Sequence, residues 1–323
     1  MWVSVQCAVQ GKSHARQNIP CQDKTFFKAE NGIFSASLAD GAGSCRLSHL
    51  GAELATRAIC DALCSDFEKL FSNDDGLTVK SELTDRILNK LSEAAEEHDC
   101  DIKDLSSTLL FIAVHENRFM LGHIGDGVIG YIKNNEVKVA SAPDNGEFAN
   151  TTVFTTSKSA TDSIKLIKGN LGSIAGFVLM SDGPEAVFYD KARGILAPSL
   201  KRMFLLSRLL PAPLMERKIT DFFQSVVTKR TNDDCSMVIF TNLPDSDGSS
   251  EQSARNNLRA TTSENIARKY LAIINNLSEN SMTCKELAKI VHINSRYLEP
   301  TLNKLCDMGY LTCSDDGVYS VAE

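Results

Sequence analysis

Three short stretches of the chain share one design, in which an apolar run ends in an aspartate that is followed by glycine. They are residues 33–39 with Asp40-Gly41, Ile124-Gly125-Asp126-Gly127, and Leu179-Met180-Ser181-Asp182-Gly183. A single Asp-Gly pair is most often a β-turn. Its recurrence after three apolar runs predicts that three carboxylates converge at strand ends, where glycine lets the backbone approach an ion or a phosphate closely.

A fourth carboxylate is expected at the same place. Asn31-Gly32 is a strong hairpin signal between a short strand, residues 25–28, and the apolar run that leads into Asp40. Antiparallel pairing of these strands places Asp23, which precedes the first, beside Asp40, which follows the second. The sequence therefore predicts two neighbouring carboxylates at one end of a hairpin.

The composition is that of a soluble, globular chain. Its 323 residues are 43% hydrophobic, enough for one large domain and a small one. The net charge of -7 argues against chain-wide affinity for nucleic acid or anionic membrane. No apolar run is long enough for a membrane helix and polar residues come too early for a secretory leader, so we expect no membrane partner and a cytoplasmic location. The ten cysteines show neither disulfide nor zinc spacing.

Periodicity predicts alternating strands and helices. The stretch 11–20 is polar and loop-like, and 141–163 resembles a polar flap beside a site. Strands are expected at 2–9, 25–28, 33–39, 107–114, 118–124, 128–133, 137–140, 177–180 and 237–241, the four from 107 to 140 as one meander. Helices are expected from Ser48, around 83–95, and at about 199–210 and 214–228.

The end of the chain has a different character. Residues 244–262 lack nearly all large apolar side chains and are rich in Ser, Asp, Asn and Gly, which predicts a flexible linker. The expected domains are therefore 1–243, the linker 244–262, and 263–323. The last has the pattern of three helices and a hairpin turning at Asp315-Asp316-Gly317, as in a winged helix. Its acidic residues outnumber its basic ones, so a DNA partner and a protein partner both remain open.

Carboxylates clustered without His or Cys favour hard cations, Mg²⁺ or Mn²⁺. Two such ions held about 4 Å apart can bridge one hydroxide and hold a phosphoryl group for in-line attack. Phosphoester hydrolysis is therefore the predicted chemistry. A nucleophilic serine elbow, a Walker phosphate loop and an obvious Cys/His pairing are all absent from the sequence.

The motifs resemble those of the metal-dependent serine/threonine phosphatases called PPM or protein phosphatase 2C, across residues 1 to about 241. Both their order and their spacing match. The matching segments are Asp23, Ala39-Asp40-Gly41-Ala42-Gly43, Ser107-Thr108-Leu109, His123-Ile124-Gly125-Asp126, Met180-Ser181-Asp182-Gly183 and Asp233-Asp234.

This resemblance implies an α+β fold, a four-layer α-β-β-α sandwich of the phosphatase 2C type, followed by the small winged-helix domain. It implies hydrolysis of phosphoproteins, the targets of Ser/Thr kinases, with catalysis at Arg16 and Asp40. The implied ligands of two central Mn²⁺ or Mg²⁺ ions are Asp23, Asp40, Asp182, Asp233 and the Gly41 carbonyl, with Asp126 serving a third, looser ion.

Several positions depart from the family pattern. The phosphate-binding Arg usually lies five residues before the first metal Asp, where this chain has Asn18, so Arg16 becomes the candidate. Ala42 stands where some relatives have an acid His, Val128 replaces an Arg, and Asp234 replaces the closing Asn. Two alternatives therefore stay open: a catalytically weak or inactive phosphatase-like scaffold, and a DNA-binding transcription regulator with a phosphatase-like sensor domain.

Overall fold

The computed structural model describes residues 1–134, 136–143, 152–243, 272–273, 276–277, 280–307 and 311–321. The larger of its two compact units comprises Met1–Arg208 and Met215–Leu243. The predicted linker 244–262, most of the predicted helix that follows it, and residues 144–151 of the predicted flap lie outside the described residues. No helix in the described ranges has the length and apolar character needed to cross a membrane.

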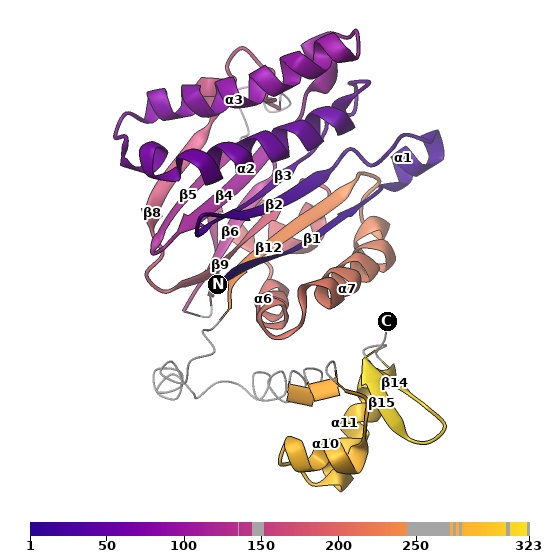
Figure 1. The fold of residues 1–323 in the computed structure, drawn as a ribbon. Helices are drawn as coiled ribbons and strands as arrows, with labels where there is room; N and C mark the ends of the chain where they lie inside the picture. The colour runs from indigo at the N-terminus through magenta and orange to yellow at the C-terminus, as the bar shows by residue number, and fades with distance from the viewer. Residues whose placement is uncertain are drawn as a thin grey trace. The chain divides into compact units, whose positions relative to one another are not determined.

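Two five-stranded antiparallel sheets form the centre of the larger unit (Figure 1). The first has the order β2 (Lys24–Glu30), β3 (Ile33–Ala39), β4 (Leu109–His115), β5 (Arg118–Ile124) and β8 (Lys165–Asn170). The second has the order β1 (Trp2–Val9), β12 (Cys235–Asn242), β9 (Ile174–Met180), β6 (Val128–Lys133) and β7 (Glu136–Ser141).

The two sheets pack face to face through alternate residues of their strands, as a period of two requires. Leu38 and Leu110 of the first sheet belong to the same buried cluster as Val238 of the second. At the edge of this cluster the ring of Trp2 stacks on that of Phe240, with centroids 4.8 Å apart. Burial of this apolar surface stabilises the packing of the two sheets against each other.

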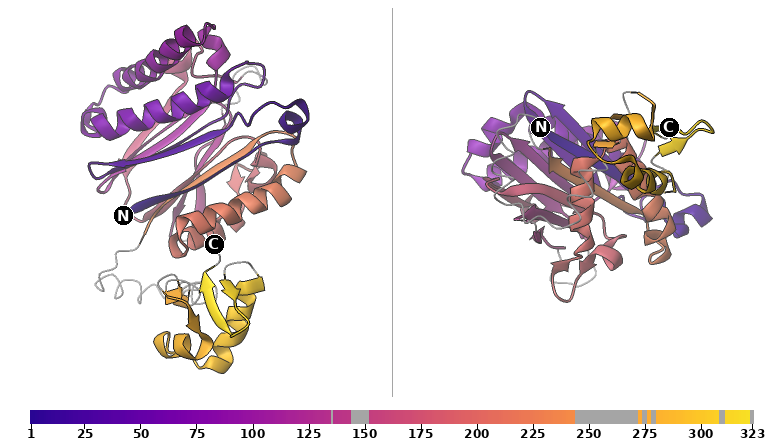
Figure 2. Two further views of the ribbon diagram at one scale, coloured as in Figure 1. Left: turned by 45° about the vertical axis from the view of Figure 1, so that its right-hand side comes forward. Right: turned by 90° about the horizontal axis from the view of Figure 1, so that it is seen from below.

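Helices cover the outer faces of both sheets (Figures 1 and 2). On the first sheet, α2 (Ser48–Ser72) and α3 (Gly76–Glu97) bury an apolar cluster against β3 and β4. The absence of a side chain at Gly51 lets α2 approach the backbone at Leu105 closely, because a Cβ at Gly51 would lie 1.9 Å from the Leu105 carbonyl oxygen. On the second sheet lie α6 (Ser199–Leu209) and α7 (Ala212–Ser225). The unit is thus a mixed α/β fold in layers, as predicted.

Several local expectations were wrong. Residues expected to form a loop include a helix, α1 (Lys12–Gln17), which tertiary contacts hold despite its polar composition. Strand β8 and the short hairpin β10 (Tyr189–Asp190) and β11 (Ile195–Leu196) were not predicted. The expected four-stranded meander is divided, since β4 and β5 belong to one sheet and β6 and β7 to the other. The remaining short helices of this unit are α4 (Ala160–Ser163), α5 (Glu185–Phe188) and the 3₁₀ turns Ile102–Leu105 and Val227–Lys229.

Residues 280–307 and 311–321 of the C-terminal unit contain two helices and a three-stranded sheet. The helices are α10 (Cys284–Ile290) and α11 (Ser295–Asp307), and the sheet has the order β13 (Met282–Thr283), β15 (Val318–Val321), β14 (Leu311–Cys313). Thr283 and Glu286 form a capping box that fixes the start of α10. Among the described residues from 272 onward, the buried apolar side chains are Ile273, Leu277, Leu287, Leu298, Leu302, Leu305, Leu311 and Tyr319.

Candidate functional site

The hairpin register brings the first two predicted carboxylates together. Lys24 of β2 pairs with Ala39 of β3, so Asp23 and Asp40 flank the last pair of the ladder at one end of the first sheet. Asn31 and Gly32 form the turn with φ values of 53° and 76°, the left-handed backbone that Asn-Gly favours. The predicted hairpin and its consequence for Asp23 and Asp40 are confirmed.

The other predicted carboxylates lie at one end of the second sheet. Asp182 follows β9, whose last residue, Met180, pairs with Met237 of β12 on one side and with Val128 of β6 on the other. Asp233 and Asp126 precede β12 and β6 respectively. Because these strands are antiparallel, the end of β9 lies beside the starts of its two neighbours, which gathers all three carboxylates.

A serine hydroxyl connects the two groups. Ser181 Oγ donates to Asp23 Oδ2 at 2.8 Å and accepts from the Ser236 backbone N–H at 3.0 Å. Asp23 is 1% exposed, so this bond orients a buried carboxylate across the interface between the sheets. The motif Met180-Ser181-Asp182-Gly183 does not reveal this role of Ser181, because its partner Asp23 lies 158 residues away in the chain.

Burial dominates the electrostatics of this cluster, and repulsion between the carboxylates adds to it. Burial, followed by the negative charges of Asp23 and Asp182, raises the pKa of Asp40 well above its ordinary value. Burial likewise raises the pKa of Asp23 and that of Asp182, and the hydrogen bond from Ser181 only partly offsets this for Asp23. The Asp40 carboxyl influences the pKa of each of the other two, so the three carboxyls form one cluster. Such a site favours either a shared proton or a cation.

The donor set fits a hard divalent cation. Asp23 Oδ1 and Asp182 Oδ1 are buried and have no hydrogen-bond partner in the described chain. Orphaned carboxylate oxygens of this kind are costly unless they bind a cation or a proton. The fit lies in donor chemistry rather than in a closed cage: within the described ranges, no three His, Cys, Asp or Glu side chains surround one point as metal ligands do.

The Asp-Gly loop after β3 is held rigidly by backbone contacts. Gly41 N–H donates to the Gln22 carbonyl at 3.3 Å, and Ala42 N–H donates to the Ser106 carbonyl at 2.9 Å. A Cβ at Gly41 would lie 2.8 Å from the Ser48 carbonyl carbon, so glycine is required where α2 begins. Ala42 is buried and offers no group for acid catalysis.

Asp126 has a neighbour from the predicted flap. Thr152 Oγ1 donates to Asp126 Oδ2 at 2.7 Å. The turn before it is fixed by His123, whose Nε2 lies 2.9 Å from the Gly125 carbonyl and whose Nδ1 lies 2.7 Å from Ser141 Oγ. Gly125 itself has a φ of +108°, which only glycine adopts readily. Asp126 also contributes to the raised pKa of Asp182, which places it near the main cluster.

The last two predicted positions differ in accessibility. Asp233 is exposed and contributes, after other causes, to the raised pKa of Asp40 and Asp182. Asp234 is 1% exposed, and each of its two oxygens accepts a backbone N–H group. Arg16 is exposed on α1 and makes no ion pair within the described part of the chain. The structure therefore does not bring Arg16 into contact with the carboxylates.

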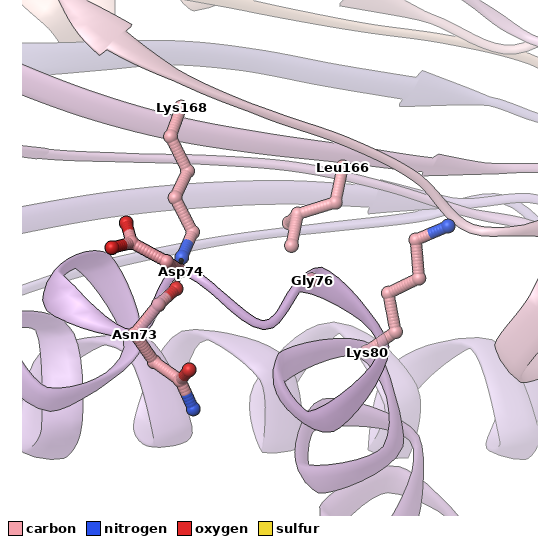
Figure 3. A pocket seen from close by; sticks show the side chains of 6 residues that line it. All are labelled: Asn73, Asp74, Gly76, Lys80, Leu166 and Lys168. Carbon is pink, nitrogen blue, oxygen red and sulfur yellow. Dashed lines mark hydrogen bonds between the residues drawn. The ribbon is translucent and has the colours of Figure 1, made fainter.

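A separate hollow of about 280 Å³ lies between the end of α2, the start of α3 and β8 (Figure 3). Lys168 Nζ donates there to the carbonyls of Leu70 and Asn73, both at 2.6 Å. These carbonyls belong to the C-terminal end of α2, whereas the carboxylates adjoin its N-terminal end. Since a helix rises 1.5 Å per residue, roughly 37 Å separates the two places. The hollow is lined by Asn73, Asp74, Gly76, Lys80, Leu166 and Lys168.

Two antiparallel sheets with helices outside, and carboxylates where the strand ends meet, are the arrangement found in phosphatase 2C-like proteins. The chain belongs to the protein phosphatase 2C family, whose model matches residues 10–224. It is 24% identical over 258 residues to serine/threonine-protein phosphatase 3 of Escherichia coli K12, covering 74% of this chain and 97% of that protein.

Solved structures show the same fold. The serine/threonine phosphatase of S. agalactiae superposes with a TM-score of 0.52 at 14% identity, over 75% of this chain and 99% of that one. The catalytic domain of the phosphatase PstP, solved with two manganese ions, superposes with a TM-score of 0.50 at 17% identity, over 75% of this chain and 99% of that one. Both matches leave about a quarter of this chain uncovered.

Proposed function

We propose that this chain is a Mn²⁺- or Mg²⁺-dependent protein phosphatase that hydrolyses phosphoserine and phosphothreonine esters in the cytoplasm. The observation that carries the proposal is the clustering of Asp23, Asp40 and Asp182. Asp23 Oδ1 and Asp182 Oδ1 are buried and have no hydrogen-bond partner among the described residues. When bound, a pair of divalent cations supplies the positive charge that neutralises the phosphoryl oxygens and activates water.

The side chains have distinct proposed roles. Asp23 and Asp182 bind cations through their unpartnered oxygens, and Asp40, whose pKa is raised by burial and by their charges, binds the cations beside them. Asp233 closes the set from the solvent side, since its exposed carboxylate can still reach an ion. The Gly41 carbonyl completes it. Asp126, already shared with Thr152, serves a third and more loosely held cation.

Arg16 is the proposed phosphate-binding residue. Its guanidinium offers a fork of donors that matches phosphate oxygens and would be repelled by a cation. Its exposure and its lack of an ion pair in the described chain leave the fork free for a substrate.

Hydrolysis of an aryl phosphate with Mn²⁺, Mg²⁺, Ca²⁺ or EDTA tests the central proposal. We expect turnover with Mn²⁺ or Mg²⁺ and none with EDTA. Mn²⁺ binding without turnover would instead favour the inactive scaffold, and the absence of both would reject the cation site.

For the C-terminal unit we propose a winged-helix module that targets the phosphatase. The packing of α10 and α11 against a small sheet supports this interpretation. Tyr297, 70% exposed, lies with Arg296 at the start of α11 and offers a contact surface. Gel retardation of the full-length chain on duplex DNA over a range of salt separates the two partner classes, because phosphate contacts weaken steeply with salt.

A further inference from the structure

Asp234 joins three segments that are distant in the sequence. Its Oδ1 accepts the Gly11 backbone N–H and its Oδ2 accepts the Gln22 backbone N–H, both at 2.6 Å. The carboxylate is 1% exposed, so water does not compete for these bonds. Hydrogen bonds from backbone N–H groups to a carboxylate are stronger than those to a neutral acceptor.

The same place is reinforced by close backbone packing. Ser13 N–H donates to the Asn232 carbonyl at 2.9 Å. A Cβ at Gly11 would lie 2.2 Å from the Asp233 carbonyl carbon, so the loop between β1 and α1 lies directly on this segment. His14 Nδ1 also lies 2.9 Å from Asp234 Oδ2, but without the alignment of a hydrogen bond.

Two of the proposed cation ligands, Asp23 and Asp233, are next in the chain to residues that form these hydrogen bonds. Gln22, whose N–H is held, precedes Asp23, and Asp234 itself follows Asp233. Asp23 leads into the first sheet and Asp233 into the second. One carboxylate therefore fixes the backbones that carry both ligands, and through Gly11 it also fixes the loop that leads into α1 and Arg16.

We propose that Asp234 is a positioning residue that sets the separation of Asp23 and Asp233 for cation binding, and that this role requires a carboxylate. This inference rests on the proposed function. An asparagine, the residue that the family pattern has here, offers one acceptor oxygen and one amino group. In either orientation the amino group would face the N–H of Gly11 or of Gln22, and one buried donor would lose its partner.

The test compares Asp234→Asn with wild type by Mn²⁺ titration calorimetry and by electron paramagnetic resonance of free Mn²⁺. We expect the Mn²⁺ dissociation constant of the variant to rise at least tenfold. At saturating aryl phosphate and subsaturating Mn²⁺, kcat should fall in parallel. The KM for the aryl phosphate should stay unchanged. Asp61→Asn is the matched control, since this exposed carboxylate on α2 pairs only with Lys28 at 2.7 Å among the described residues. It should bind Mn²⁺ as wild type does.

A measurement on the wild type keeps the inference testable if Asp234→Asn does not fold. The amide hydrogens of Gly11 and Gln22 should exchange with deuterium as slowly as those of the central strands. Rapid exchange of these two amides, or wild-type Mn²⁺ affinity in a folded Asp234→Asn variant, would overturn the inference and leave the proposed function standing. A wild type that binds no Mn²⁺ would overturn both.

Discussion

The Asp40 carboxyl is crowded by two others, and this crowding has opposite consequences for stability and for cation binding. Burial and the charges of Asp23 and Asp182 raise the pKa of Asp40, so its ionised form destabilises the metal-free fold. The same charges attract a divalent cation. A residue that weakens the apo protein is therefore expected to be essential once the ion is present.

Asp40→Asn should separate these effects. The amide removes a charge from the cluster, so the metal-free variant should melt above the metal-free wild type, by about 2–4 °C for each kcal/mol of repulsion removed. Added Mn²⁺ should raise the wild-type Tm much more than that of the variant. Mn²⁺-dependent hydrolysis should be lost, as it should in Asp182→Asn. Calorimetric melting with and without Mn²⁺ measures this, and wild-type turnover in both variants would reject the site.

Arg16→Ala should act on substrate rather than on the cation. Loss of a charge-assisted hydrogen bond of about 1.5–3 kcal/mol should raise KM for an aryl phosphate by roughly tenfold or more. The Mn²⁺ dissociation constant should not change. Lys12→Ala, on the same helix, is the control for a general loss of positive charge. An unaltered KM would mean that Arg16 is only a solvated surface residue.

Single-residue roles were predictable where a local pattern encodes them. Asp23 and Asp40 were placed together because Asn31-Gly32 fixes the hairpin register. Asp234 was identified as a departure but not as a hydrogen-bonding centre, because its two donors lie 223 and 212 residues away. Contacts of that range are set by how the sheets pack, which no local sequence pattern contains.

At the level of elements, the positions of the strands were predicted better than the way in which the strands pair into sheets. The period-two pattern found β5 and β6, but the turn between them passes from one sheet to the other. Strand β8 was missed because its sequence, Lys-Leu-Ile-Lys-Gly-Asn, is polar and lies at a sheet edge. Helix α1 was missed because its stability comes from the contacts of Gly11 and Ser13 with the segment before β12 rather than from an apolar face.

The end of α2 offers a test at this scale. Lys168 Nζ donates to the Leu70, Phe71 and Asn73 carbonyls and so satisfies groups that a helix end leaves unpaired. Lys168→Met keeps the apolar stem and removes the donors, and should destabilise the fold by about 1–3 kcal/mol. Chemical denaturation measures the loss. Lys80→Met, in the same hollow, should cost little. Neither change should alter kcat, because the carboxylates lie at the other end of α2.

For the whole molecule, the decisive question is whether the C-terminal unit is needed for catalysis. The carboxylates, the sheets that hold them and the match to the family all lie before Leu243. The relatives that align over nearly their full length also cover only about three quarters of this chain. The C-terminal unit is therefore expected to direct the phosphatase to a partner rather than to complete its site.

A chain ending at Leu243 should fold and hydrolyse an aryl phosphate at nearly the full-length rate, while losing selectivity for its phosphoprotein target. The composition of residues 244–262, poor in large apolar side chains, also predicts that limited proteolysis cuts there and leaves two stable fragments. A docked module that completes the site needs apolar contacts along this stretch, and such contacts would protect it. Resistance to cleavage, or a several-fold change in small-substrate turnover after truncation, would therefore contradict a tethered targeting role.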